Sequence, residues 1–382
     1  MPRWLYYSLI LTIVAPLIAL VMGPQAPAMV IFIFAIIGLI PLAAFIGRAT
    51  EDLEYYVGPV AGGLLNATFG NAPELIIGIF ALQAGLLSVV KASITGSIIS
   101  NALLVLGGSL ALGGWRWGEQ YFDSRAAGQF SVMMVMAVAG LLIPYTASVV
   151  PANQFRTAPI SVGISIILLL VYTMYLASNI FHLRSARRNP TKRGKPITVP
   201  LTPPKESDEE EVDAVSGGAD PREVNVGKPP PPWLSLLILL GATVLTALNS
   251  ELLVGALEPV THQLGWSPVF VGLVIIPIVG NAAEHSSSLI VAYKDRVDLS
   301  IAIAAGSSIQ VATFVAPVLV LVSFFFSHPL DLIFQPLELA LLGLATILFT
   351  FISLDGKSSW LSGMQLLAVY IMACIVFFLI PG

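Results

Sequence analysis

The sequence reads G-N-A-P-E from Gly70 to Glu74 and G-N-A-A-E-H from Gly280 to His285, inside two long apolar stretches. The second copy follows the first by 210 positions, and further matches keep this spacing without a gap. A constant spacing indicates an internal duplication. The further matches pair Ala92 with Ala302, Gly96 with Gly306, Ser97 with Ser307, Ile99 with Ile309 and Ala102 with Ala312.

Each copy places one carboxylate, Glu74 or Glu284, where a membrane helix rarely carries a charge. A charged side chain at bilayer depth costs about 2.5 to 3.5 kcal/mol on insertion scales. It is therefore tolerated chiefly where it faces a cavity, a partner or an ion. We expect the two glutamates to share one cation site.

The composition is that of a membrane protein. The 382 residues are 56% hydrophobic and only 10% charged, whereas soluble domains typically carry about 25% charged residues. We expect the lipid bilayer as the surrounding medium and, without a basic patch, no nucleic-acid partner. Cys374 is the only cysteine, so disulfides and cysteine-rich metal sites are excluded. No cofactor and no enzymatic activity are expected, and both a monomer and a homo-oligomer remain open.

The apolar stretches predict an all-α polytopic fold of about eleven transmembrane helices, because about 20 apolar residues cross the hydrocarbon core as a helix. Residues 5–22 are interpreted as a retained first span rather than a signal peptide. The expected spans are 5–22, 28–47, 59–85, 88–114, 128–149, 159–183, 233–257, 267–293, 297–327, 333–354 and 360–380.

Four segments follow from these spans. Residues 1–27 form an N-terminal transmembrane helix, 28–183 a first five-helix repeat, 184–232 a polar linker and 233–382 a second five-helix repeat. A unit with an odd number of crossings leaves the membrane on the far side, so the second copy enters upside down. The sequence thus predicts inverted repeats, which typically hold substrate near the midplane where interrupted helices meet.

The distribution of cations predicts the orientation. With the N-terminus in the cytoplasm, sixteen of the eighteen Lys and Arg residues lie on the cytoplasmic side, nine of them in the linker. Only Lys91 and Arg156 lie on the other side. Positive residues favour cytoplasmic loops, so the N-terminus and the linker are predicted to be cytoplasmic. The acidic run in the linker is interpreted as solvated chain rather than as a cation sensor.

The residues around the two glutamates suit a hard cation. Pro73 and Pro277 lack an amide hydrogen, which within a helix would free the carbonyls of Phe69 and Leu273. Carboxylates, amides, hydroxyls and carbonyls together favour a divalent ion with flexible coordination, such as calcium. The neutral oxygens expected to line the site belong to Asn71, Asn281, Ser97, Asn101, Ser307 and Gln310.

Protons compete with a cation for paired carboxylates, because like-charge repulsion and desolvation favour the protonated form. Glu74 and Glu284 are therefore candidates for both metal binding and proton coupling. Cation binding on one side of the membrane would expel protons, and reprotonation on the other side would expel the cation. His285 adds a second titrating group beside Glu284.

Other interpretations remain open. Small residues often form helix packing surfaces, Ser97 and Ser307 can bond their own helix backbone, and Glu251 and Glu258 suit either an access path or the membrane interface. A cation channel would use the same ligands without alternating access. An intramembrane hydrolase would pair one of the two serines with His285 as base, and would leave the duplicated glutamates unexplained.

Four stretches in order resemble the calcium/proton exchanger family of the cation/calcium exchanger superfamily. They are L-L-N-A-T-F-G-N-A-P-E-L from Leu64, G-S-I-I-S-N-A-L-L-V-L-G from Gly96, V-G-N-A-A-E-H from Val279 and G-S-S-I-Q from Gly306. The resemblance implies exchange of cytoplasmic calcium for protons, with Glu74 and Glu284 as central ligands. The same six amide and hydroxyl residues would line the site, and His285 would serve transport.

The resemblance also bears on coupling and location. Sodium/calcium exchangers of the same superfamily carry Ser or Thr in place of the Asn of G-N-A, so protons are favoured over sodium. Sodium coupling, or another divalent cation, is the alternative. Plant and fungal relatives often carry longer N-terminal tails than this sequence has. We therefore expect a prokaryotic plasma-membrane protein rather than a vacuolar one.

Overall fold

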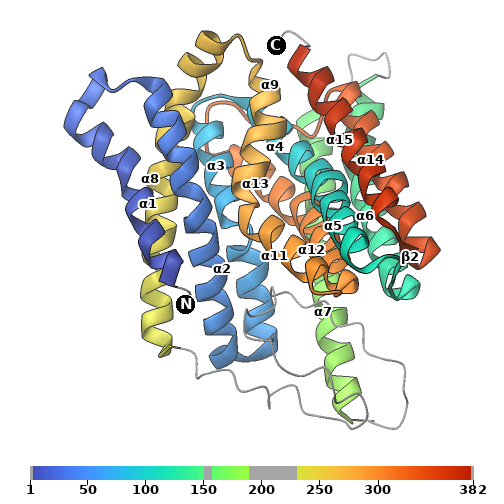
Figure 1. Cartoon of the computed structure of the whole chain (residues 1–382). Helices are drawn as coiled ribbons and strands as arrows, with labels where there is room; N and C mark the ends of the chain where they lie inside the picture. Colours follow the sequence, from blue (N-terminus) through green and yellow to red (C-terminus); the bar gives the residue numbers. More distant parts are fainter. Residues whose placement is uncertain (1–2, 150–156, 189–229, 380–382) are drawn as a thin grey trace.

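The computed structural model describes residues 3–149, 157–188 and 230–379, and these are almost entirely helical (Figure 1). The elements up to residue 188 are α1 (Arg3–Met22), η1 (Gly23–Gln25), α2 (Ala28–Phe69), α3 (Ala72–Gln83), α4 (Leu87–Ile99), η2 (Ser100–Val105), α5 (Leu106–Trp117), β1 (Gln120–Tyr121), α6 (Ser124–Ser148) and α7 (Thr157–Arg188). Those that follow are α8 (Pro232–Leu264), α9 (Pro268–Phe270), η3 (Val271–Ile275), α10 (Ile276–Gly280), α11 (Ala282–Tyr293), α12 (Val297–Gln310), η4 (Val311–Val315), α13 (Ala316–Ser323), α14 (Pro336–Asp355), β2 (Lys357–Ser358) and α15 (Trp360–Leu379).

The helices confirm the expected count of about eleven membrane spans. Within the described ranges, nine helices are long and apolar enough to cross a membrane, and the pair Pro268–Gly280 and Ala282–Tyr293, bent by 62°, forms a tenth span. The short apolar helix α3, together with the end of α2, accounts for the eleventh. Helix α2 is 42 residues long because it continues through a kink at Gly58 (φ 81°). Most of the linker, residues 189–229, lies outside the described residues.

The two halves enter the molecule from opposite ends (Figure 1). Helix α2 starts at the top of the view, whereas α8 starts at the bottom, the end at which α7 finishes. We call the end with Arg188 and Pro232 the linker face, and the other end the opposite face. The linker face also carries β1, β2 and the turn 294–296, whereas the opposite face carries the turn 84–86 and the segment 324–335.

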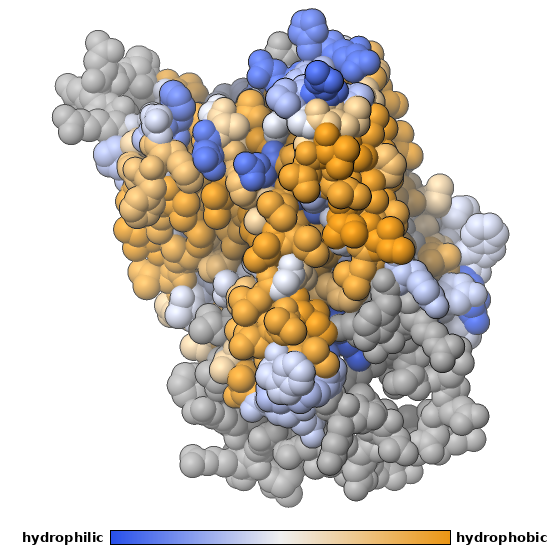
Figure 2. Space-filling view, turned by 90° about the vertical axis from the view of Figure 1, so that its left-hand side faces the viewer, coloured by the Kyte–Doolittle hydropathy of each residue, from blue (hydrophilic) through white to orange (hydrophobic). Residues whose placement is uncertain are grey.

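The central helices come from both halves. In the apolar 18-residue windows of Leu87–Trp117 and Val297–Ser323, 83% and 78% of the residues are buried, against 11% for the window of Tyr7–Gln25. Space-filling Figure 2 shows the flank on the α1 side, where hydrophobic side chains form a broad surface and hydrophilic ones gather toward the upper end. An exposed apolar surface of this extent suits lipid.

At the linker face, a short sheet joins the two halves. Strands β1 and β2 pair antiparallel, with Gln120 opposite Ser358 and Tyr121 opposite Lys357. Beside them, Lys357 Nζ donates to Glu119 Oε1 at 3.1 Å, and this bond lowers the pKa of the Glu119 carboxyl. The guanidinium of Arg116 lies 3.9 Å from the centre of the Tyr293 ring. Helices α5, α6, α11 and α14 are thus tied together at this end.

Candidate cation site

Both copies of the repeated motif interrupt a helix at the Gly-Asn pair. In the first copy, α2 ends at Phe69 and α3 begins at Ala72, with Asn71 at φ −101° and ψ 18° between them. In the second copy, α10 ends at Gly280 and Asn281 has nearly the same backbone angles, φ −92° and ψ 15°. The sequence predicts that Pro73 frees a carbonyl within the first helix and that the second break depends on Pro277 and Gly280. Gly280 is the last residue before the second break. Pro73 follows the first break, in the first turn of α3, where a missing amide hydrogen leaves no bond unmade.

The geometry of the breaks puts each glutamate in the first turn of the next helix. Glu74 lies in the first turn of α3 and Glu284 in the first turn of α11. The positive end of a helix dipole favours a negative charge at this position. Each break therefore helps to stabilise a carboxylate at the start of the helix that follows it.

The two carboxylates lie near each other. The side chain of Glu74 reaches the second copy of the motif: a Cβ atom on Gly280 would lie 2.9 Å from Glu74 Oε1. Glu74 also interacts electrostatically with Glu284. One oxygen of each, Oε2, is buried without a hydrogen-bond partner among the described residues. Buried polar atoms are rarely left without a partner, so this pair suits a bound cation or protons.

A chain of hydrogen bonds runs beside the glutamates and crosses between the halves at three of its four links. Asn281 Nδ2 donates to Ser97 Oγ at 3.1 Å, and Asn281 Oδ1 accepts from Ser307 Oγ at 3.4 Å. Asn101 Nδ2 donates to Ser307 Oγ at 2.8 Å. His285 Nε2 lies 3.2 Å from Asn101 Oδ1, so this nitrogen donates if the amide nitrogen of Asn101 serves Ser307. Four buried polar side chains and His285 thus form one network.

The remaining predicted residues are placed differently. Asn71 Nδ2 donates to Gln310 Oε1 at 2.7 Å, which is a further bond between the halves. Phe69 is the last residue of α2, directly before the break. The carbonyl of Leu273 faces Gly96 on α4, because a Cβ on Gly96 would collide with it. The structure therefore joins four of the six amide and hydroxyl side chains in one network and the other two in a separate pair, and the ligand role of each residue stays a prediction.

The described contacts weigh against the interpretation that Ser97 and Ser307 bond only their own helix backbone. Ser97 and Ser307 bond to asparagine side chains from the other half or from the adjacent helix, and His285 bonds to Asn101 rather than to a serine. Within the part of the chain that the structure describes, no three His, Cys, Asp or Glu residues gather as a metal site. The site accordingly offers two carboxylates and neutral oxygens.

Sequence reasoning missed the wide helical turns around the site. Segments η2, η3 and η4 are π-helical, and η2 and η4 follow Ser97 and Ser307 at nearly matching positions. Such turns are rare and frequently lie at functional sites, but no residue type signals them. It also missed Glu338, which is 1% exposed and caps α14 through a bond from the Gln335 amide at 3.1 Å. We assign Glu338 a structural role.

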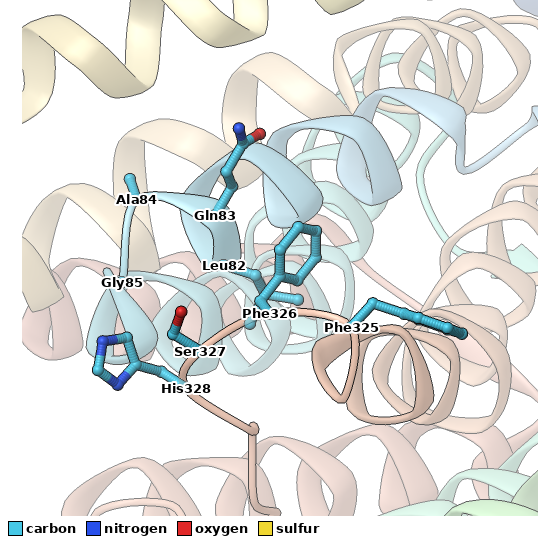
Figure 3. Close-up of a pocket in the computed structure, with 8 residues that line it drawn as sticks. All are labelled: Leu82, Gln83, Ala84, Gly85, Phe325, Phe326, Ser327 and His328. Carbon is cyan, nitrogen blue, oxygen red and sulfur yellow. The ribbon is translucent and has the colours of Figure 1, made fainter.

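A pocket of about 310 Å³ opens on the opposite face, away from the glutamates (Figure 3). It lies between the α3–α4 turn, with Gln83 and Gly85, and the segment after α13, with Phe325, Ser327 and His328. None of the predicted site residues lines it. We do not assign the transport site to this pocket.

Comparison with known proteins identifies the family of this chain. Residues 27–181 and 234–379 match the sequence family described as sodium/calcium exchanger protein. The chain belongs to this family. The sodium/calcium exchanger match covers both halves and omits α1 and the linker.

Relatives of this exchanger include proteins from bacteria and fungi. It is 42% identical over 360 residues to a Ca²⁺/H⁺ antiporter of Aphanothece halophytica, covering 92% of this chain and 90% of the relative. It is 40% identical over 358 residues to the Ca²⁺/H⁺ antiporter ChaA of Bacillus subtilis, covering 93% of each. A vacuolar calcium ion transporter of Schizosaccharomyces pombe is 37% identical, with 92% of this chain and 79% of that protein covered.

Solved structures share the fold of this exchanger. The structure of native YfkE superposes with a TM-score of 0.77 at 37% identity and covers 98% of this chain and 100% of its own. The H⁺/Ca²⁺ exchanger CAX superposes with a TM-score of 0.68 at 16% identity, covering 98% of this chain and 91% of its own. The second likeness supports the fold alone.

Proposed function

We propose that this exchanger is a secondary antiporter that moves Ca²⁺ out of the cytoplasm in exchange for H⁺. The observation that carries the proposal is the pair Glu74 and Glu284, one from each half, each with a buried oxygen that lacks a partner among the described residues. Two negative charges balance a divalent ion, and the surrounding amides and hydroxyls supply further hard oxygens. Several relatives at about 40% identity are named Ca²⁺/H⁺ antiporters.

Proton coupling would reside in the same carboxylates. When Ca²⁺ leaves, the close pair of glutamates takes up protons, because two buried like charges are unfavourable. The protonated pair no longer attracts Ca²⁺, and the site turns back to the other side of the membrane with its protons bound. There Ca²⁺ binding displaces the protons. His285 takes part through its contact with Asn101. Alternating access of one midplane site to the two sides would complete the cycle.

The linker face is proposed as the cytoplasmic side of a prokaryotic plasma membrane, with the N-terminus on that side. The described cations support this orientation: Arg116, Lys294, Arg296 and Lys357 lie at the linker face, whereas Lys91 lies toward the opposite face. Positive residues favour the cytoplasmic side. Bacterial relatives with similar length support the plasma membrane.

Transported Ca²⁺ and H⁺ are substrates in this proposal, and no resident cofactor takes part. The alternative coupling ion is Na⁺, because the matched family is described as sodium/calcium exchanger protein. A cation channel is the less favoured alternative, since the two interrupted helices with inverted placement suit a carrier.

The test is Ca²⁺ flux into proteoliposomes that contain the purified protein. Uptake should follow an imposed pH gradient and should stay at the level of protein-free liposomes under an imposed Na⁺ gradient. Uptake driven only by Na⁺ would move the exchanger to sodium coupling. Ca²⁺ flux that needs neither gradient and exceeds carrier turnover would make it a channel.

A further inference from the structure

On one side of the site, two helices from opposite halves touch at glycines. A Cβ on Gly96 of α4 would collide with the carbonyl of Leu273 in η3. A Cβ on Gly272 would lie 2.8 Å from both the Cβ of Ala92 and the carbonyl oxygen of Val89. Contacts this close require glycine, since there is no room for any side chain. The crossing between α4 and η3 is closed.

The duplication assigns a matching crossing on the other side of the site. At the spacing of 210 residues, Gly96 corresponds to Gly306 on α12, and Gly272 corresponds to Gly62 near the end of α2. A Cβ on Gly306 would meet no atom within 4 Å. The matching crossing is therefore open in this structure.

Gly62 is covered by the side chain of Glu54 rather than by α12. Helix α2 turns at Gly58, and the side chain of Glu54 folds back over Gly62, where a Cβ would collide with Glu54 Cγ. Glu54 Oε2 is buried and has no hydrogen-bond partner among the described residues. Glu54 thus occupies the surface of Gly62 that α12 would need for the matching contact.

We propose that the linker side of the site closes when α12 packs through Gly306 against α2 at Gly62, as α4 now packs through Gly96 against η3. Glu54 acts as a wedge that leaves Gly62 during this closure. The inference rests on the proposed exchange function and names the contact that shuts one of its two access routes. The crossing at Gly96 opens in the same step, so that the site faces only one side at a time.

The proposal predicts that a larger side chain at position 306 leaves the structure described here intact but prevents the linker side from closing. Because Gly306 faces open space, Gly306→Leu should fold. The added side chain would stand between α12 and α2 and hold the linker side open. Ca²⁺ would still reach and bind the site from the linker face, but it would not cross.

The experiment compares Gly306→Leu with Gly343→Leu, a matched control on α14 whose Cβ position is also empty. Both are measured by H⁺-driven Ca²⁺ uptake into proteoliposomes and by Ca²⁺ binding to purified protein. Gly306→Leu should lose uptake by on the order of a hundredfold while binding stays intact, because a conformational step is blocked. Gly343→Leu should retain both. Full uptake by Gly306→Leu would overturn the proposal, whereas absent uptake by the unmodified protein would overturn the exchange function instead.

A second measurement keeps the test independent of folding in the leucine variant. Gly62→Cys and Gly306→Cys are combined with Cys374→Ala, so that the two introduced thiols are the only ones. During Ca²⁺/H⁺ turnover, an oxidant should cross-link the pair and stop uptake, and a reductant should restore it. Absence of cross-linking during active turnover would contradict closure at this contact.

Discussion

The carboxylate of Glu74 lies against Gly280, the glycine that opens the second copy of the repeated motif. A Cβ atom at Gly280 would lie 2.9 Å from Glu74 Oε1 and 3.2 Å from its carboxyl carbon. The Glu74 carboxylate of the first half thus lies against the backbone next to the helix break of the second half. Neither half alone contains this arrangement, so the site depends on their packing.

Loss of either glutamate charge should abolish exchange. Glu74→Gln and Glu284→Gln each remove one of the two charges that balance a divalent ion, and we expect a fall in H⁺-driven Ca²⁺ uptake on the order of a hundredfold, about 3 kcal/mol. Glu258→Gln is the matched control, because Glu258 lies on the exposed surface of α8. Near-normal uptake by either site variant would refute a shared two-glutamate site.

Gly280→Ala should weaken Ca²⁺ binding without unfolding the protein. The new methyl group would press on the Glu74 carboxylate, which can move because it is the end of a flexible side chain. We expect the Ca²⁺ concentration for half-maximal uptake to rise on the order of tenfold, which is about 1.4 kcal/mol of binding energy. Gly163→Ala, where the Cβ position is empty, serves as control. An equal Ca²⁺ concentration for half-maximal uptake in both variants would mean that Ca²⁺ binding does not depend on the position of the Glu74 carboxylate against Gly280.

Two substitutions at His285 separate proton coupling from positioning. Glutamine can still donate to Asn101 Oδ1, as His285 Nε2 does at 3.2 Å, but it does not titrate. We expect both His285→Gln and His285→Ala to alter the pH dependence of Ca²⁺ uptake, measured from pH 5.5 to 8.5 on either side of the ordinary histidine pKa of about 6.5. If His285→Gln keeps the pH profile of the unmodified protein and only His285→Ala loses activity, the residue serves as a hydrogen-bond donor alone.

The closed and open crossings should respond differently to one added methyl group. Gly96→Ala forces a Cβ against the backbone of Leu273, and overpacking of this kind costs about 1 to 3 kcal/mol. Gly306→Ala, at the matching position, meets no atom within 4 Å. The midpoint of thermal unfolding in detergent should fall clearly for Gly96→Ala and stay nearly unchanged for Gly306→Ala. Equal midpoints would contradict the difference between the two crossings.

Impermeant labels should reach the opposite face from outside the cell. In a Cys374→Ala background, a cysteine at Phe325, which is 87% exposed on the opposite face, should react with a membrane-impermeant maleimide added to intact cells. A cysteine at Tyr121, which is 70% exposed on the linker face, should react only after the cells are opened. The reverse pattern would place the N-terminus outside.

Much of the site follows from the sequence because polar side chains inside a membrane are costly and therefore few. Asn71, Asn101 and Gln310 stand out in apolar stretches for this reason, and the structure buries all three. Their pairing was not predictable. The matched residues Asn71 and Asn281 bond to Gln310 and Ser97 respectively, which are not matched residues. Pairing depends on distances between crossing helices, and sequence spacing does not determine those distances.

The exact positions of the helix breaks were likewise not predictable from the sequence. Pro73, and Pro277 with Gly280, indicate where each helix is interrupted, and the interruptions fall at Gly70 and Asn71 in the first copy and at Asn281, directly after Gly280, in the second. A proline in the first turn of a helix is accommodated without a lost bond. Proline therefore marked the neighbourhood of each break, and the packing of Glu74 against Gly280 accompanies its actual position.

The number of apolar helices, the duplication and the residue types of the site follow from the sequence alone, because the cost of burying a polar group in lipid depends on the residue and its neighbours in the chain. Which of the two matching crossings is closed depends on how the folded chain packs. Gly96 and Gly306 are equivalent in the duplicated sequence, and an equivalent sequence permits either contact. The close packing of α4 on η3, and the side chain of Glu54 over Gly62, select one of them.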